Sequence, residues 1–362
     1  MERERMQLLD YGRFAAAAAV LAFHYFFNGI ANGKLSSLGH EPVLSEVARY
    51  GYLGVNFFFL ISGYVILLSA RGKSAHEFAV ARALRLYPAF CFAVLLTSAV
   101  ALLWGGQRMS VSLSQVAANL TMAAPWFGQD YVDGVYWTLS YELRFYAAVL
   151  LALLLGAARR LEVLCGAWVG LQLLAHALGL QHLPLLGSYY VYFAAGALLA
   201  VLKNRPRPGP WLPLLLGALY LCASFAMEEA GERSLATGHA ISPWVAAASV
   251  LGFFVFFGVL NTPQGSALRL PSARLVGGLT YPLYLIHAHV GYMLLSRFAS
   301  EEHKVLAYAL VIAAVLAIAL YMHLVIERAM APMWRVLFVS AVGAPLQALQ
   351  HSARRLFAAP RP

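Results

Sequence analysis

Long apolar runs alternate with short polar segments along the whole chain. Several of these runs reach the roughly 20 apolar residues that a helix needs to cross a bilayer. The pattern predicts an all-α fold, a polytopic transmembrane bundle of about ten helices. The expected spans are residues 11–27, 52–69, 87–104, 137–156, 162–178, 187–202, 210–226, 243–260, 275–295 and 305–326. Residues 111–127 form a run that is too short and polar to span, so we expect an interfacial or re-entrant segment there.

Composition agrees with a membrane protein and excludes a soluble one. Of the 362 residues, 61% are hydrophobic and only 12% are charged, and the mean hydropathy is +0.69. A soluble domain of this composition would expose far too much apolar surface. The three cysteines, Cys91, Cys165 and Cys222, fall inside apolar runs without metal-ligand spacing, so they are expected to be core residues and no metal site is predicted.

The formal net charge of +10 follows from basic residues that lie between the apolar runs. This is the positive-inside pattern, so nucleic acid is not an expected partner. With the N-terminus inside, 19 of the 26 lysine and arginine residues fall in inner segments and six in outer segments, while Arg144 lies within a span. Both termini are therefore expected to be cytoplasmic. We expect residues 1–330 to form one transmembrane domain and residues 331–362 to form a cytoplasmic interfacial tail.

The first apolar run, which starts at Asp10, carries two polar residues on one face. Arg13 and His24 are eleven residues apart, which is three helical turns and about 20°, so their side chains point the same way about 16 Å apart. Ionisable residues inside a membrane are costly and usually line an interior cavity. The alternative is a histidine that only hydrogen-bonds a neighbouring helix.

The stretch VYWTLSYELRFY places Ser140, Glu142 and Arg144 inside an otherwise apolar span. A buried carboxylate or guanidinium is tolerated when it is paired or lines a wet cavity. Glu142 and Arg144 are two residues apart and point to different faces, so Arg144 is not expected to neutralise Glu142. A salt bridge between helices is the structural alternative for Glu142.

Two further segments carry candidate chemistry. Arg82 and Arg85, at i and i+3 in an inner loop before the third span, either flank the membrane or bind phosphate through their forked donors. His287 lies halfway along a later span. Counted from the helix ends, His24, Glu142 and His287 reach a similar depth, so we expect Glu142 to orient His24 as a general base.

Five motifs in chain order resemble the integral-membrane acyltransferase-3 family, which O-acylates polysaccharides and other surface glycans. They are RFAAAAAVLAFH, FFFLISGY, RALRLYP, YWTLSYELRFY and LTYPLYLIH. The resemblance covers residues 6 to 330. Two departures are Thr138, where the family often has serine, and Ala329, where proline is common. Ala329 follows Glu327 and Arg328 directly, so the departures bear on where Glu327 lies more than on the expected reaction.

The resemblance implies an acyl-CoA-dependent O-acyltransferase of the bacterial inner membrane. The donor would be acyl-CoA, usually acetyl-CoA, and the acceptor a hydroxyl on a glycan or lipid-linked sugar. It implies that His24 and Glu142 are catalytic and that Arg13, Arg82 and Arg85 bind the donor. The further candidates for the substrate cavity are Asp10, Ser140, Arg144, Tyr146, Tyr284 and His287. The alternative function is a proton-coupled transporter or flippase of a glycan or lipid-linked sugar, against which the lack of a visible internal repeat argues.

Overall fold

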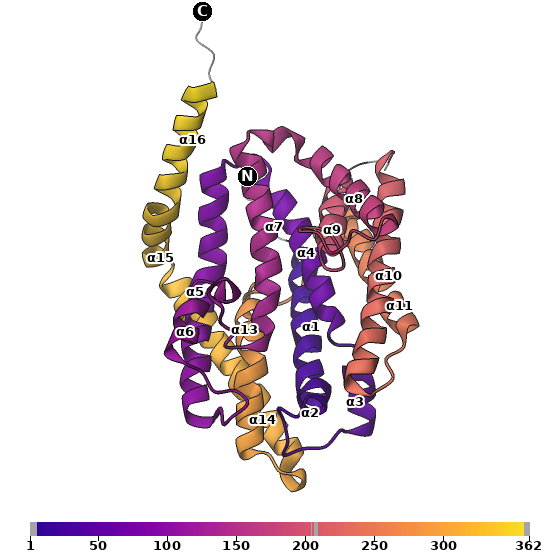
Figure 1. Cartoon of the computed structure of the whole chain (residues 1–362), viewed down its shortest axis with the longest axis vertical. Helices are drawn as coiled ribbons and strands as arrows, with labels where there is room; N and C mark the ends of the chain where they lie inside the picture. Colours follow the sequence, from indigo (N-terminus) through magenta and orange to yellow (C-terminus); the bar gives the residue numbers. More distant parts are fainter. Residues whose placement is uncertain (1–5, 204, 206–208, 358–362) are drawn as a thin grey trace, which may run out of the picture.

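The computed structural model describes residues 6–203, 205 and 209–357, which form helices and connecting turns without strands. This confirms the predicted all-α class (Figure 1). The helices are α1 Gln7–Phe23, η1 His24–Asn28, α2 Gly29–Ala31, α3 Pro42–Ala48, α4 Leu53–Ala70, α5 Ala75–Trp104, α6 Leu113–Asn119, η2 Ala124–Phe127, η3 Gly134–Tyr136, α7 Trp137–Leu154, η4 Ala157–Arg160, α8 Leu161–Ala177, α9 Tyr190–Leu202, α10 Trp211–Thr237, α11 Pro243–Leu260, α12 Pro263–Ala267, α13 Ala273–Phe298, η5 Glu301–His303, α14 Lys304–Tyr321, η6 Met322–Ala329, α15 Ala331–Phe338, η7 Val339–Gly343 and α16 Ala344–Phe357. The segments η1, η6 and η7 are π-helical, and η2 to η5 are 3₁₀-helical.

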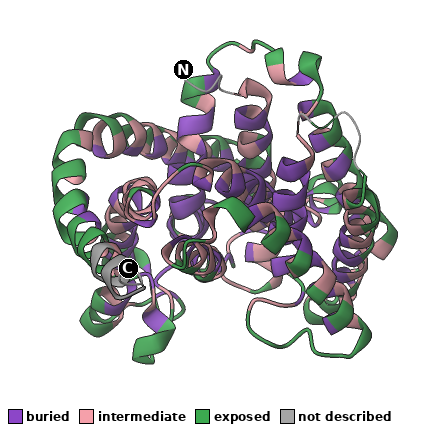
Figure 2. Cartoon of the chain, turned by 90° about the horizontal axis from the view of Figure 1, so that it is seen from above, coloured by how far each residue is buried: buried purple, intermediate pink, exposed green. Residues whose placement is uncertain are grey.

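Seven helical segments in the described part of the chain are long and apolar enough to cross a membrane. They are Gln7–Ala31, Pro42–Ala70, Ala75–Trp104, Gly134–Leu154, Trp211–Thr237, Pro243–Leu260 and Glu301–Ala329. Large apolar side chains on the periphery are exposed, for example Leu102 and Trp244 at 75% each, whereas buried residues gather in the central helices (Figure 2). Exposure of so much apolar surface to water is unfavourable, whereas lipid accommodates it, so the chain is a multi-pass membrane protein.

The predicted count of ten spans is not confirmed. Three of the expected helices are either too short or not apolar enough to be counted as membrane-crossing. Helix α8 has 17 residues and α9 only 13. Helix α13 is long enough at 26 residues, but the polar groups of its histidines and tyrosines lower its hydropathy. Helix α9 is short and buried almost throughout, which is typical of a helix enclosed by other helices rather than by lipid.

Close backbone contact fixes α9 against α4 at the centre of the bundle. A Cβ atom on Gly63 of α4 would clash with the carbonyl of Phe193, and one on Gly196 of α9 would clash with the carbonyl of Leu60. Small residues permit such contact between membrane helices. Gly63 and Gly196 therefore allow the backbones of α4 and α9 to touch.

Helix α5 begins earlier than the sequence analysis predicted. The side chain of Ser74 accepts from the backbone N–H of Glu77, and the Glu77 carboxylate accepts from the backbone N–H of Ser74. This capping box starts a 30-residue helix at Ala75. Arg82 and Arg85 therefore lie within a helix, and the prediction that they occupy a loop is wrong.

The chain after α14 forms η6, α15, η7 and α16, which run beside α5 (Figure 1). The indole N–H of Trp334 donates to the carbonyl of Ile326 at 2.9 Å. The division into a domain 1–330 and a tail 331–362 stays a prediction. Arg3, Arg5, Arg207 and Arg361, which contributed to the charge count, lie outside the described residues.

Candidate active site

Four cavities follow one another through the bundle, and neighbouring cavities share lining residues. The mouth cavity, about 1020 Å³, lies beside the start of α1 and is lined by Asp10, Arg13, Arg85 and Arg269 among others. The arginine cavity, about 110 Å³, shares Arg13 and Arg85 with it. Shared side chains mean shared walls, so these two cavities adjoin.

The remaining two cavities continue the row toward the opposite end of the bundle. The histidine cavity, about 200 Å³, is lined by His24 and shares Val55 and Tyr284 with the arginine cavity. The loop cavity, about 440 Å³, shares Lys34 and His289 with the histidine cavity. A wall formed by Val55 and Tyr284 therefore separates a side rich in arginine from the side that holds His24.

Helices α1 and α13 bring His24 to the centre of this row. The hydroxyl of Tyr25 donates to the backbone carbonyl of His287 at 2.8 Å, and the ring of Tyr292 packs against Gly29. The π-helical turn η1 starts at His24, and such turns are frequent at functional sites. The His24 and His287 rings lie edge to face, with centroids 4.9 Å apart.

The hydrogen-bond pattern assigns a protonation state to both imidazoles. His287 Nδ1 lies 2.8 Å from the carbonyl oxygen of Tyr284, and a carbonyl only accepts, so Nδ1 carries the hydrogen and Nε2 accepts. His24 Nδ1 lies 2.8 Å from the carbonyl oxygen of Val20 and 3.2 Å from His287 Nε2, so its single N–H is shared between these two acceptors. The lone pair of His24 is then on Nε2, where a base needs it.

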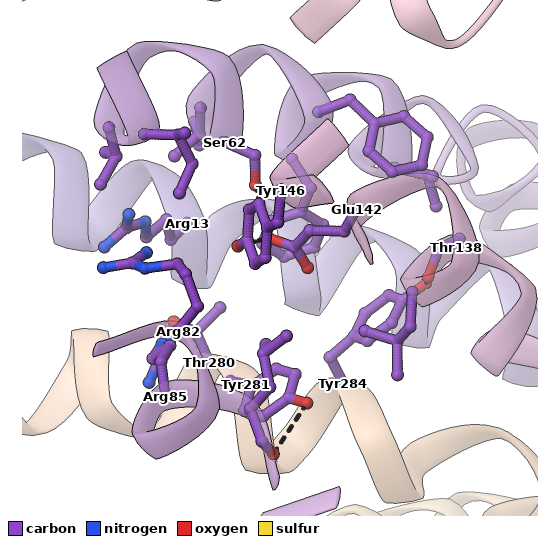
Figure 3. Close-up of a pocket in the computed structure, with 18 residues that line it drawn as sticks. Arg13, Ser62, Arg82, Arg85, Thr138, Glu142, Tyr146, Thr280, Tyr281 and Tyr284 are labelled. Carbon is purple, nitrogen blue, oxygen red and sulfur yellow. Dashed lines mark hydrogen bonds between the residues drawn. The ribbon is translucent and has the colours of Figure 1, made fainter. Parts of the chain in front are cut away.

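Glu142 has different partners from the one that the sequence analysis predicted. Its carboxylate accepts from the Ser62 hydroxyl at 2.9 Å and from the Tyr146 hydroxyl, and it lines the arginine cavity (Figure 3). The residue of α7 at the level of Tyr284 is Thr138, whose Oγ1 lies 2.8 Å from the Tyr284 hydroxyl. Glu142 is one turn, about 6 Å, further along α7. The predicted contact with His24 is therefore wrong, because the depth estimate assumed that the helix ends are level.

The three predicted donor-binding arginines lie together on one side of the arginine cavity (Figure 3). Arg13 is 3.9 Å from Asp10, and Arg85 is 3.6 Å from Glu327. Arg82 packs its guanidinium 5.8 Å from the Tyr146 ring centroid, and its buried Nε has no hydrogen-bond partner. A buried donor without a partner is costly and is available to an anionic ligand.

Three predicted candidates do not line the row of cavities: Ser140, Arg144 and His287, the last of which contacts His24 instead. The Ser140 hydroxyl contacts the hydroxyl of Tyr131, and Arg144 is exposed in a separate groove on α7. Helical geometry explains this, since both lie about 200° around the helix from Glu142. Tyr146 and Tyr284 line the arginine cavity, while Asp10 lines the mouth cavity.

Several residues near His24 were missed by the sequence analysis. Lys34 Nζ lies 2.8 Å from His289 Nε2, and His289 Nδ1 lies 2.9 Å from the carbonyl of Val132. Asp133 accepts from the backbone N–H of His289 at 2.9 Å, which ties the loop before α7 to α13. Burial lowers the pKa of Lys34. Trp137 also lines the histidine cavity and provides an aromatic surface there. The histidine in IHAHV after His287 was the available signal for His289.

These features belong to a known class of membrane enzymes. Residues 7–324 match the acyltransferase domain of the acyltransferase-3 family, and the chain belongs to that family. It is similar to the exopolysaccharide production protein ExoZ of Rhizobium meliloti (strain 1021), with 26% identity over 250 residues, covering 66% of this chain and 75% of the relative. It is also similar to nodulation protein 10 of Rhizobium leguminosarum bv. viciae, with 27% identity over 282 residues, covering 67% of this chain and 72% of the relative. No solved structure matches the chain. The protein is an acyltransferase of the membrane.

Proposed function

We propose that this protein transfers an acyl group from acyl-CoA to a hydroxyl of a polysaccharide or its precursor, and that the acyl group is acetyl. The row of cavities is the observation that carries the proposal, because it joins a basic entrance to a histidine with a free Nε2 lone pair. The printed name of the relative ExoZ, an exopolysaccharide production protein, supports a polysaccharide acceptor.

Acyl-CoA suits the basic side of the row in charge and in length. CoA is polyanionic, and the mouth cavity presents Arg13, Arg85, Arg269 and Arg274. Forked guanidinium donors bind phosphate bidentately. The eleven residues from Arg13 to His24 span about 16 Å of helix, which is similar to the length of the pantetheine arm. The thioester would then reach the wall of Val55 and Tyr284, beside the histidine cavity.

The acceptor would enter from the opposite side, through the loop cavity. His24 Nε2 takes the proton from the acceptor hydroxyl, whose oxygen attacks the thioester carbonyl carbon. The new C–O bond forms, the C–S bond breaks, and the departing CoA thiolate receives the proton from His24. His287 Nε2 accepts the hydrogen bond from His24 Nδ1–H throughout, so it fixes the tautomer and stabilises the imidazolium.

This reaction places the two ends of the bundle in different compartments. The excess of lysine and arginine in the segments on the N-terminal side supports a cytoplasmic location for both termini and for the mouth cavity. The donor would then come from the cytoplasm and the acceptor from the other side of a bacterial inner membrane.

The test is acyl transfer by purified protein in nanodiscs. Labelled acetyl-CoA and glycan from a strain without this protein are the substrates, and both labelled ester and free CoA thiol are measured. We expect His24→Ala to lower transfer by about 10²–10⁴-fold, the usual contribution of a general base. His303→Ala, which changes an exposed histidine outside the cavities, is the control. Near-normal transfer by folded His24→Ala protein would refute the proposal.

A further inference from the structure

Arg144 is the cation of α7, and the proposed reaction does not use it. It lies ten residues from either end of the candidate span Gly134–Leu154, about 15 Å from each by the helical rise. Its side chain is exposed on the face of α7 away from Glu142. A cation at this depth of a membrane is costly, and such residues usually have a partner or a function.

The side chain lies in a largely apolar groove of about 970 Å³ between α7 and the loop that follows α8, which we name the α7 groove. On the C-terminal side of Arg144, α7 lines the groove with small and apolar residues, namely Ala147, Ala148, Leu151, Ala152 and Leu155. From Tyr141 to Leu155 this lining extends about 21 Å along the helix. The α7 wall of the groove is therefore a long apolar track with one arginine partway along it, and the opposite wall adds the polar side chains of Gln181 and His182.

The loop after α8 forms the other side of the groove at membrane depth. The carbonyl of Leu185 accepts from the Trp168 indole N–H at 2.8 Å and from the Gln172 amide at 3.1 Å. Trp168 lies nine residues before the end of α8 at Ala177, so the loop descends roughly 13 Å beside that helix. Non-helical backbone at this depth is tolerated where protein covers it or where it lines a polar site.

The polar groups of the groove lack an anionic partner. In the part of the chain that the structure describes, Arg144 contacts the Tyr141 ring at 5.7 Å, and no carboxylate forms an ion pair with it. Tyr190 also lines the groove; it is only 4% exposed, and its hydroxyl has no hydrogen-bond partner. Ser188 adds an exposed hydroxyl. A phosphate in the groove would supply the anionic partner that the Arg144 guanidinium lacks, and the exposed Ser188 hydroxyl is a further donor on the groove wall.

One aromatic layer separates this groove from the histidine cavity. Trp137 lines the histidine cavity, whereas Tyr141 and Tyr189 line the α7 groove. The ring centroid of Trp137 lies 4.9 Å from that of Tyr189 and 5.6 Å from that of Tyr141. In addition, Arg144 points back toward Tyr141, as helical side chains point toward the helix N-terminus. A headgroup at Arg144 is thus beside the cavity of His24.

We propose that the α7 groove binds the lipid of a lipid-linked glycan, with the phosphate between lipid and sugar at Arg144. The lipid chain lies over the alanines of α7, and the sugar reaches over the layer of Trp137 and Tyr189 toward His24. The role of this glycan as acyl acceptor rests on the proposed function, whereas its binding does not. The apolar length of the α7 wall matches a lipid chain, and the guanidinium of Arg144 matches a phosphate.

Binding is tested with the full chain in phosphatidylcholine nanodiscs that contain a long-chain polyprenyl phosphate as the probe. Native mass spectrometry counts the lipids that stay bound. We expect Arg144→Ala to reduce retention of the probe by roughly tenfold or more, the effect of losing charge-assisted hydrogen bonds. Arg144→Lys should lose less. Arg297→Ala is the matched control, since Arg297 is also exposed and stacks on an aromatic ring, that of Phe298.

Two results would overturn the proposal. One is equal retention of the probe by wild-type and Arg144→Ala protein. The other is equal retention of phosphatidylglycerol in competition, which would identify the groove as a site for ordinary anionic lipid.

An activity measurement separates this proposal from the proposed function. With labelled acetyl-CoA, Arg144→Ala should lower transfer to a phosphate-linked lipid glycan by roughly tenfold while transfer to the same oligosaccharide without lipid is unchanged. Equal loss with both acceptors would refute the lipid role. If the wild-type protein transfers to neither acceptor while binding of the probe still depends on Arg144, the proposed function fails and the lipid site stands.

Discussion

Replacement of His287 by alanine tests whether it positions His24. The change removes the acceptor at 3.2 Å from His24 Nδ1 and leaves the bond to the carbonyl of Val20. A hydrogen bond between neutral groups contributes about 0.5–1.5 kcal/mol, and one to a charged group about 1.5–3 kcal/mol. The bond from His24 to His287 is between neutral groups before the reaction and comes from a charged imidazolium in the transition state. Only the difference between these two bond energies, about 1–1.5 kcal/mol, accelerates the reaction. About 1.4 kcal/mol corresponds to a factor of ten, so we expect kcat to fall about tenfold.

The assay is steady-state acyl transfer at matched amounts of folded protein, with melting temperature as the check on folding. The KM for acyl-CoA should change little, because His287 does not line the arginine cavity. His176→Ala is the control, a histidine of α8 outside the row of cavities. In a His24→Ala background the His287 change should add little, since residues that act as a unit are not additive. Unchanged kcat, or a loss as large as that of His24→Ala, would contradict a positioning role.

The other predictions concern the donor side and the packing. Arg82→Ala and Arg85→Lys should each raise the KM for acyl-CoA, because bidentate contact needs the guanidinium fork; unchanged CoA affinity in a titration of both variants would refute donor binding. Glu142→Gln should lower the melting temperature more than kcat, because its two hydroxyl donors lose a charged acceptor; a kcat effect at full stability would restore a catalytic role. Gly196→Ala should destabilise the fold by about 1–3 kcal/mol through its clash with the Leu60 carbonyl, measured by thermal unfolding.

The sequence was sufficient for the fold class, because the spacing of apolar runs responds directly to bilayer thickness. It was also sufficient for the placement of His24 and Arg13, since helical periodicity within one span fixes their relative directions. Both side chains line the row of cavities. The relative directions of side chains within one helix do not depend on how the neighbouring helices pack.

Relations between helices were the part that the sequence could not supply. The offset of α7 against α13 sets Thr138, not Glu142, beside Tyr284, and no local pattern encodes such an offset. The contact between His24 and His287 joins residues 263 positions apart. The start of α5 was missed for a different reason. Ser74 and Glu77 have the sequence pattern of a capping box, but the arginines that follow were interpreted as a positively charged loop.

The wall of Val55 and Tyr284 also matters for the membrane as an electrical barrier. Cavities reach it from the mouth side and from the side of the loop before α7. In the proposed reaction these two cavities open to different compartments, so the wall would have to hold the membrane potential during acyl transfer. The Tyr284 hydroxyl is anchored to Thr138 and is thus kept in the gap. A smaller residue there would open a conductive pore, and an enzyme would become an ion leak.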